Sequence, residues 1–423
     1  MTGRRSVAGV DLAWRGEAVV VAAGPLVAPT RADLADAVVE LAGRPATARL
    51  GFVLDASGRR WLAPQDRDEH LRRCVHELPP QTDRPALIMA AAAIDLGAAP
   101  FAFVISGDHV VLAVDHVIGD GYFITRLLAA AIELATGGER PGWLDREPVH
   151  RPLTRALWQQ FGREPRRLRA LVEHARRHRA AAPAPETAAV PGRPWTPSPD
   201  CRIRSTDRAA LRELKAWRRE HAPGVSTIPL AIAAADLARR AVGVPAVAAP
   251  LVLFDARRHL RPHGADITGN FCAGLRLDVT DPGDPVAVDD AIKHAVALGR
   301  PLAVTAAAAF AARRTRSRQD AQAAGSGDGW DVAYTHMGKP PELARLTRAG
   351  GERAAYFGLL PPSGPRGVTF AMSEIGEHLN VSVSFHCNEV DARLVDAVLD
   401  ELVGDPVGLL DRYRTTARAV APT

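Results

Sequence analysis

The sequence predicts a mixed α/β protein with two similar lobes, and three observations lead to this fold class. The chain has 423 residues, 47% hydrophobic and 24% charged, a globular composition with enough length for two or three domains. Six prolines fall within residues 181–199, where they exclude a helix or a central strand and predict a linker. The linker separates residues 1–180 from residues 200–423, and both parts mix strand and helix patterns.

In the first part, apolar runs around short polar turns predict strands, and apolar residues at helical spacing predict helices. The runs 101–106 and 110–115 flank Gly107-Asp108-His109, which is typical of a tight β-hairpin. The expected elements, in order, are a strand-length run at 18–23, a helix at 31–41, a hairpin at 50–54 and 60–62, the hairpin just described, and a helix at 122–136. An arginine-rich helix at 163–179 follows, either a solvated face or a docking surface.

The second part predicts strands and helices in alternation, followed by several strands in succession. Thr206 is the expected N-cap of its first helix, and Ser226-Thr227 cap the second. The expected strands are 201–205, 246–254, 271–278, 331–335, 367–373 and 379–386, and the expected helices are 207–221, 228–242, 284–298 and 391–403. This order favours mixed α+β layers over a pure βαβ repeat.

Charge and cysteine content exclude several classes of function. The net charge is +5 and only three residues are lysine, so arginine carries nearly all positive charge. No zinc-finger spacing, helix-turn-helix signature or interleaving of basic and aromatic residues points to nucleic acid. The four cysteines form no CxxC pair, so we expect reduced thiols and a cytoplasmic protein. Asp11, Arg15 and Glu17 interrupt the apolar segment near the N-terminus, and no run reaches the roughly eighteen residues of a membrane span, so neither an export signal nor a membrane partner is expected.

One cluster carries residues suited to catalysis: Asp115-His116-Val117-Ile118-Gly119-Asp120-Gly121. His116 ends a predicted buried strand, where a neutral imidazole can take a proton from an incoming hydroxyl or amine. Gly119 and Gly121 let the backbone turn sharply and leave room for a substrate. From the pattern alone a second interpretation stays open, because a histidine at a strand end is usually a satisfied core or rim residue and Asp120 can simply be an N-cap.

The cluster resembles the HxxxDG core of the chloramphenicol-acetyltransferase-like superfamily, with His116, Asp120 and Gly121 at the motif positions. This superfamily includes nonribosomal-peptide condensation domains, BAHD acyltransferases and polyketide-associated acyltransferases. Three later segments are similar to family segments in the same order: 255–262 with Gly269-Asn270-Phe271, then 334–338, then 379–386 with Asn388 and a terminal helix. The matches run from about residue 30 to residue 403.

The resemblance implies two α/β lobes with a central tunnel between them and His116 midway along it. The implied reaction transfers an acyl group from a thioester, on coenzyme A or a carrier protein's phosphopantetheine, to a small-molecule alcohol or amine. Ester or amide formation of this kind belongs to natural-product or lipid biosynthesis. His116 would be the base, no metal or cofactor beyond the donor substrate is implied, and a monomer is expected.

The resemblance also implies roles for residues around the base. Asp120 is expected to pair with Arg257 and so to fix the glycine turn and the angle of His116. The candidates for substrate binding or for stabilising an oxyanion are Gly119, Asn270, Thr335, Thr369 and Ser373.

The sequence departs from the family at two points. Asp115 stands where HHxxxDG has its first histidine, and the DFGWG motif of BAHD enzymes is absent. The family's catalytic histidine is retained as His116, which favours an enzyme. The alternatives are an inactive condensation-like protein that recruits a partner such as a carrier protein, and a metal hydrolase using His116 and nearby acids. Because side chains alternate along a strand, we expect Asp115 to bond backbone amides or an arginine rather than the imidazole.

Overall fold

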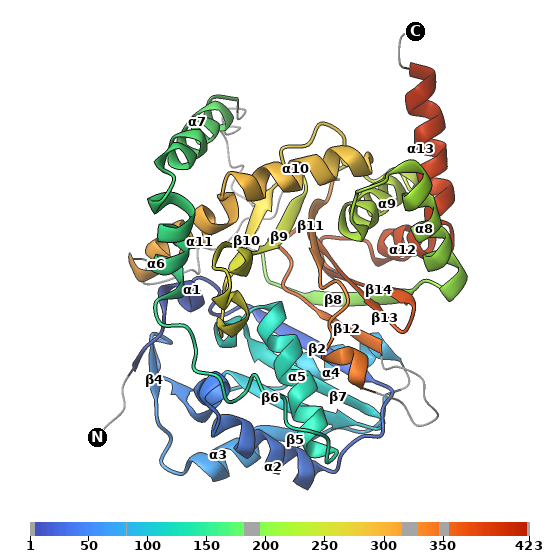
Figure 1. Ribbon diagram of the computed structural model, residues 1–423. Coiled ribbons are helices and arrows are strands. Elements are labelled where there is room, and N and C mark those ends of the chain that lie inside the picture. Colours follow the sequence, from blue (N-terminus) through green and yellow to red (C-terminus); the bar gives the residue numbers. More distant parts are fainter. Residues whose placement is uncertain (1–4, 82, 182–194, 315–328, 347–354, 421–423) are drawn as a thin grey trace.

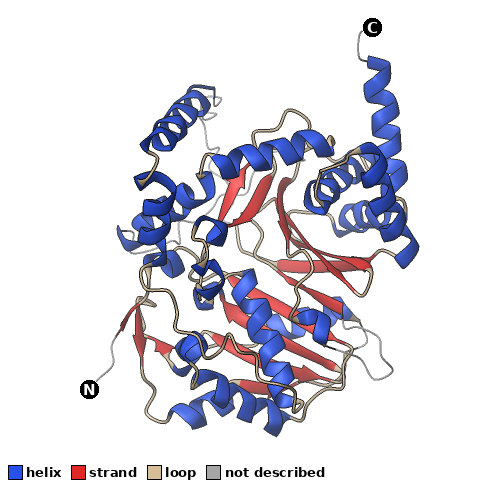
Figure 2. Cartoon of the chain, in the orientation of Figure 1, coloured by secondary structure: helices blue, strands red, loops and turns tan. Residues whose placement is uncertain are grey.

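The computed structural model describes residues 5–81, 83–181, 195–314, 329–346 and 355–420. These residues form two lobes, each built on one mixed β-sheet with helices against it (Figures 1 and 2). The predicted fold class, mixed α/β with two lobes, is therefore confirmed.

The first lobe is built on a five-stranded sheet. Its strands, in spatial order, are β12 (Ala355–Leu359), β2 (Ala18–Gly24), β7 (His109–Asp115), β6 (Phe101–Ser106) and β5 (Val75–Glu77). Strand β2 reads as a continuous apolar run because both of its faces are covered: Val19 and Val21 pack into one core, while Val20 and Ala22 pack into another. The predicted hairpin of β6 and β7 is present with antiparallel register.

The second lobe is built on a six-stranded sheet. Its strands, in spatial order, are β10 (Cys272–Arg276), β9 (Leu251–Asp255), β11 (Asp331–His336), β13 (Gly367–Ile375), β14 (His378–His386) and β8 (Pro199–Ser205). Alternation along β13 places Val368, Phe370 and Met372 in the core beneath the helices of this lobe. The residues between them point to the opposite face of the sheet. Ile375, the last residue of β13, packs into the core of the first lobe.

Helices lie against both sheets (Figure 2). They are α1 (Gly9–Leu12), α2 (Arg31–Ala42), α3 (Arg67–Arg73), α4 (Arg84–Ala92), α5 (Gly121–Ala135), α6 (Pro152–Leu157), α7 (Pro165–Ala181), α8 (Arg208–His221), α9 (Thr227–Ala241), α10 (Pro285–Ala297), α11 (Arg300–Arg314), α12 (Ala392–Gly404) and α13 (Pro406–Val420). One of them, α4, lies between the two sheets, against β2 and β7 of the first and β8 of the second. A small sheet of β1 (Arg5–Ser6), β4 (Arg60–Leu62) and β3 (Val53–Leu54) borders the first lobe and contains the predicted second hairpin.

One strand from the second half of the sequence completes the sheet of the first lobe. Strand β12 pairs antiparallel with β2, from Ala355 opposite Gly24 to Leu359 opposite Val20. It also lies against β14, because Ser382 and Ser384 accept hydrogen bonds from the backbone N–H groups of Gly358 and Leu360. The chain therefore crosses from one lobe to the other and back (Figure 1).

Two local predictions in the second half are wrong, and three of its elements were not predicted. The N-cap of α8 is Asp207, which accepts from the backbone N–H of Ala210 at 2.6 Å, while Thr206 accepts from Leu379 of the neighbouring strand. Strand β9 is shorter than the predicted 246–254, since Ala246 makes only an isolated bridge with Trp330. Strand β12 and helices α11 and α13 were not predicted; α11 is rich in alanine and lacks a periodic row of large apolar side chains.

Most of the predicted linker, residues 182–194, lies outside the described residues. Its last residue, Pro199, begins β8, which is compatible with proline because β8 is an edge strand. All four cysteines are free thiols. Within the described ranges no single helix has the length and apolarity to cross a membrane. Only α10 and α11 taken together meet both criteria, and they are bent by 60° at their junction.

Candidate active site

The candidate base lies where β7 of the first lobe ends. His116 opens a 3₁₀ turn, His116–Ile118, that leads through Gly119 into α5. The turn is held by the residue before it: Asp115 accepts from the backbone N–H of Val117 at 2.8 Å and of Gly16 at 3.0 Å. The preferred placement of Asp115 on backbone amides is thus confirmed. Burial raises the pKa of Asp115, and these two hydrogen bonds partly oppose the rise.

A hydrogen bond from the second lobe sets the protonation pattern of the imidazole. His116 Nδ1 lies 2.8 Å from Asn270 Oδ1, and Asn270 Nδ2 donates to the backbone carbonyl of His116 at 2.8 Å. The amide oxygen can only accept, so Nδ1 carries the hydrogen and, in the neutral ring, Nε2 carries the lone pair. Within the described part of the chain no group hydrogen-bonds Nε2. The imidazole is therefore arranged to accept a proton at Nε2.

A buried carboxylate orients Asn270 in turn. Asp11, only 4% exposed, accepts at Oδ1 from the backbone N–H of Asn270 at 2.9 Å and from its Nδ2 at 3.0 Å. Burial raises the pKa of Asp11, while the nearby Arg49 guanidinium and the bonds from Asn270 lower it. Every N–H of Asn270 is engaged in these contacts. It therefore positions His116, and the predicted role as an oxyanion donor does not fit this arrangement.

Two further residues hold the turn from the first lobe. Trp14 stacks on the imidazole of His116, with ring centroids 4.7 Å apart and planes 19° from parallel. Arg49 donates to the carbonyls of Ile118 at 2.9 Å and Thr268 at 3.3 Å, so it ties the catalytic turn to the second lobe. The sequence analysis missed Asp11, Trp14 and Arg49. The sequence did contain one signal for this support. Asp11 is a charged residue in an apolar segment, and a buried carboxylate needs a hydrogen-bonding or charged partner.

The implied pair of Asp120 and Arg257 is present. Arg257 Nη1 donates to Asp120 Oδ2 at 2.6 Å, and the two side chains are 5% and 3% exposed. Asp120 also accepts from the backbone N–H of Phe123, as the N-cap of α5, and from that of Phe271 at 2.8 Å. One carboxylate thus fixes the start of the helix after His116 and joins it to the segment that carries Asn270.

Arg257 is charged and fully engaged. Burial alone would lower its pKa, but the carboxylates of Asp120 and Asp255 raise it. Its guanidinium also donates to the carbonyls of Ile267 and Gly269, the latter at 2.9 Å, and lies over the ring of Tyr122 at 4.6 Å. The planar fork of arginine suits this set of acceptors, which a lysine cannot reproduce.

Known structures share this arrangement of lobes. Trichothecene 15-O-acetyltransferase TRI3 from Fusarium sporotrichioides matches with a TM-score of 0.67 and 11% identity, over 96% of this chain and 94% of that one. A condensation domain of the monacolin K polyketide synthase MokA gives 0.61 and 14% over 97% of each chain. A variant of the starter condensation domain of rhizomide synthetase RzmA, in complex with C8-CoA and Leu-SNAC, gives 0.56 and 15% over 96% and 90%. No protein-family model and no curated protein matches the sequence.

The chain has the chloramphenicol-acetyltransferase-like fold. The neighbours are acetyl-transfer and condensation enzymes, and they cover nearly the full length of both lobes. The resemblance that His116, Asp120 and Gly121 carried is therefore confirmed at the level of the fold.

Close packing leaves no room for a side chain at Gly119 and little room at Gly121. A Cβ on Gly119 would lie 2.5 Å from Cδ1 of Phe123, a core ring that is 1% exposed. A Cβ on Gly121 would lie 3.1 Å from Sδ of Met337, which directly follows β11. The start of α5 therefore touches the end of β11, and this contact brings the second lobe's central strand to the motif.

The three hydroxyl candidates lie on β11 and β13 of the chloramphenicol-acetyltransferase-like fold, on the face opposite the helix-covered core. Ser373 lies 3.4 Å from the carbonyl of Tyr356, and its hydroxyl is engaged there. Thr369 is enclosed, at 4% exposure, and its hydroxyl has no partner among the described residues. Thr335 is half-buried near the end of β11, two residues before Met337.

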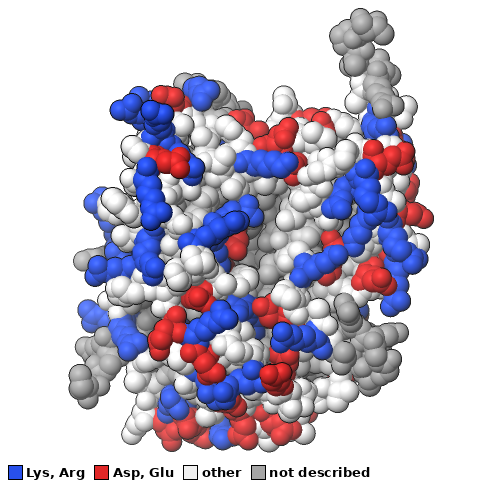
Figure 3. Space-filling view, in the orientation of Figure 1, with Lys and Arg blue, Asp and Glu red and all other residues white. Residues whose placement is uncertain are grey.

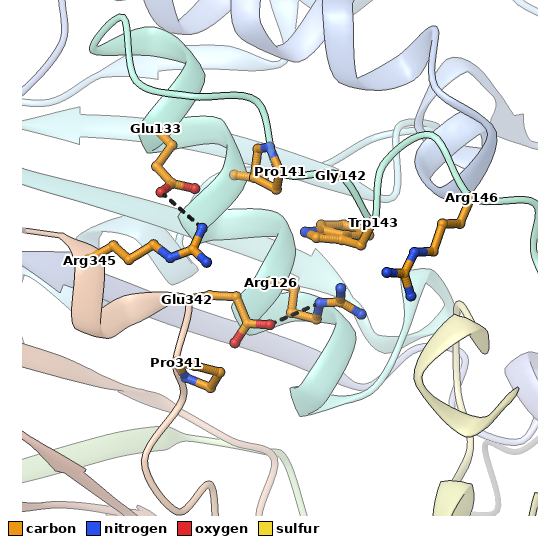
Figure 4. A pocket seen from close by; sticks show the side chains of 10 residues that line it. Arg126, Glu133, Pro141, Gly142, Trp143, Arg146, Pro341, Glu342 and Arg345 are labelled. Atoms are coloured by element: carbon orange, nitrogen blue, oxygen red, sulfur yellow. Dashed lines mark ion pairs between the residues drawn. The ribbon is translucent and has the colours of Figure 1, made fainter. Parts of the chain in front are cut away.

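A cavity of about 300 Å³ lies beside α5, where the segment leading to β12 crosses over it (Figure 4). Ion pairs tether the crossing segment to the helix: Arg126 Nε lies 3.1 Å from Glu342, and Arg345 lies 3.8 Å from Glu133. Trp143 closes one wall, and Arg126 stacks over its ring at 4.2 Å. His116 does not line this cavity.

The face drawn in Figure 3 is hollowed between the two lobes, while the tunnel that the resemblance implies stays a prediction. Among the described residues, no group of three or more His, Cys, Asp or Glu side chains is placed to hold a metal ion.

Proposed function

We propose that this chain is an acyltransferase that moves an acyl group from a thioester to an alcohol or amine. The observation that carries the proposal is the hydrogen bond between His116 Nδ1 and Asn270, which leaves Nε2 as the basic nitrogen. The fold is the one used by acetyl-transfer and condensation enzymes, which supports the same class. We place the protein in the cytoplasm, as a monomer in natural-product or lipid biosynthesis.

The proposed reaction needs one proton carrier and one donor to an oxyanion. His116 Nε2 removes the proton of the acceptor as its oxygen or nitrogen attacks the thioester carbonyl carbon. The carbonyl oxygen becomes negatively charged, and we assign its stabilisation to the hydroxyl of Thr335. The carbon–sulfur bond then breaks, and the proton on His116 passes to the leaving thiolate. Coenzyme A or phosphopantetheine is the carrier of the acyl group and therefore a substrate.

Replacing His116 with alanine tests the proposal. Thiol release is measured with a panel of acyl-CoA and acyl-N-acetylcysteamine thioesters against alcohol and amine acceptors. The variant is expected to lose about 10²–10⁴ in turnover, the usual contribution of a general base. Its melting temperature should also fall, because the variant loses the stacking on Trp14 and leaves the buried Oδ1 of Asn270 without its partner, so turnover is compared between folded proteins. Full activity in a folded His116→Ala variant would remove His116 from the mechanism.

The second candidate function is recruitment of a partner by an inactive protein. Asp115 in the place of the first motif histidine favours it, although Asp115 has a structural task in bonding Gly16 and Val117. The same assay separates the two functions. Binding of a carrier protein without turnover of any donor supports recruitment, and acyl transfer that depends on His116 supports the enzyme.

A further inference from the structure

A second cavity, of about 520 Å³, lies between α6 and the loop that follows β9. Its lining comes from two stretches of chain: α6 with the π-helical turn Trp158–Gly162 and Arg163 after it, and residues 260–263, which link two 3₁₀ turns after β9. The lining residues are Thr154, Arg155, Trp158, Gln159, Arg163, Leu260, Arg261, Pro262 and His263.

The cationic groups of this cavity lack counter-charges. Arg155, Arg163 and Arg261 are exposed, no carboxylate lines the cavity, and none of the three makes an ion pair within the described ranges. The cavity beside α5 is different, because Arg126 and Arg345 there each face a glutamate. An unpaired arginine cluster around a concave surface creates a positive potential that attracts anions.

The positive surroundings extend beyond the lining. Burial, together with the charges of Arg258 and Arg167, lowers the pKa of His259 to about 4. In the space-filling view, Lys and Arg side chains gather over α6 and α7 (Figure 3). Nearby, Arg167 of α7 pairs with Glu164 at 2.7 Å, and neither residue lines the cavity.

An aromatic side chain completes the cavity. Trp158 is 67% exposed, which is unusual for so large an apolar ring and leaves most of the indole available to a ligand. The ring is held from one side, because a Cβ on Gly162 would lie 2.5 Å from Trp158 Cε3. A held aromatic ring beside free arginines is suited to a planar base that carries phosphate groups.

We propose that this cavity binds the nucleotide end of a coenzyme A thioester, a purine base with phosphate groups; this rests on the proposed function. The base stacks on Trp158, and the guanidinium groups of Arg155, Arg163 and Arg261 hold the phosphates. The cavity's size is in the range of small-molecule sites. Arg261 follows Arg257 by four residues, so the cavity wall lies within about 14 Å of the backbone of the residue paired with Asp120.

The experiment measures binding of adenosine 3′,5′-bisphosphate, which has no acyl group and cannot react. Calorimetry gives the dissociation constant for the full chain, and quenching of tryptophan fluorescence gives a second readout. Arg163→Gln and Arg261→Gln are each expected to weaken binding about 10-fold or more, the scale of a charge-assisted hydrogen bond. Trp158→Ser should abolish the quenching. Arg176→Gln, an exposed arginine of α7 outside the cavity, is the matched control and should leave binding unchanged.

Several results would overturn the inference. These are no binding of the bisphosphate, an equal loss in Arg176→Gln, equal affinity for adenosine without phosphates, or binding only of an acidic carrier protein to this surface. The inference and the proposed function fail separately. Acyl transfer from a carrier-type thioester without nucleotide binding overturns the inference alone, whereas nucleotide binding without any acyl transfer overturns the proposed function and leaves the site.

Discussion

Replacing Asp120 with asparagine should destabilise the protein by about 3 kcal/mol. The change keeps an oxygen for the N-cap of α5 but removes the charge that Arg257 faces. Both side chains are at most 5% exposed, and breaking such a pair costs about 3–5 kcal/mol because a charge stays buried without its partner. Asp255, 3.2 Å from the same Nη1, still neutralises part of the Arg257 charge, so the cost should lie at the lower end of this range. Asp120→Ala also loses the N-cap, worth about 1 kcal/mol more.

Urea unfolding followed by far-ultraviolet circular dichroism measures this loss as a lower midpoint at an unchanged slope. The matched control is Asp255→Asn, since the Asp255 side chain is 48% exposed and should contribute less than about 1 kcal/mol. Turnover should fall in both Asp120 variants because the turn that aims His116 is loosened. A cost below about 1 kcal/mol for Asp120→Asn, or one equal to that of the control, would refute the reasoning.

Two other predictions concern the active site, and a third concerns the buried His259 near the second cavity. Asn270→Ala should lower kcat about 10²-fold with little change in KM, because the imidazole loses the partner that fixes its Nδ1 hydrogen; an unchanged kcat would contradict this. Asp115→Asn should cost about 1 kcal/mol in unfolding free energy and leave kcat close to wild type, since Asp115 holds backbone amides; a large kcat loss at unchanged stability would show a direct role. His259 has a pKa near 6.5 in the unfolded chain and about 4 in the folded chain, so between these pH values the unfolded state binds more protons. The free energy of unfolding therefore decreases as the pH falls from about 6.5 to about 4, by up to roughly 3 kcal/mol. In His259→Gln this decrease should be smaller.

Local pattern predicted those parts of the fold that local sequence determines. The hairpin of β6 and β7 and the helix α5 follow from apolar spacing and glycine turns, and the motif pointed to His116 with its Asp120–Arg257 pair. The support of His116 by Asp11 could not be read in this way. Asp11 lies in a helix of four residues, and its partner Asn270 is 259 positions away in the other lobe. No periodicity encodes such a contact.

The same limit applies to sheet membership. Strand β12 was not predicted, and no local pattern could have assigned it to the first lobe's sheet, because its pairing with β2 spans more than 300 residues of chain. The alanine-rich α11 was missed for a different reason. Its small side chains give a weak contrast between buried and exposed faces, so the helical period is hard to see.

The crossing of β12 has a consequence for how this protein can be divided. A cut within residues 182–194 would give an N-terminal fragment whose β2 edge, apolar along nearly its whole length, has lost its neighbour. An uncovered apolar edge invites pairing between molecules, so that fragment should aggregate when produced alone. Produced together, the two fragments should reassemble, because the missing strand is carried by the C-terminal piece. The lobes are thus covalently sequential but cooperate as one folding unit, and a single unfolding transition is expected for the intact chain.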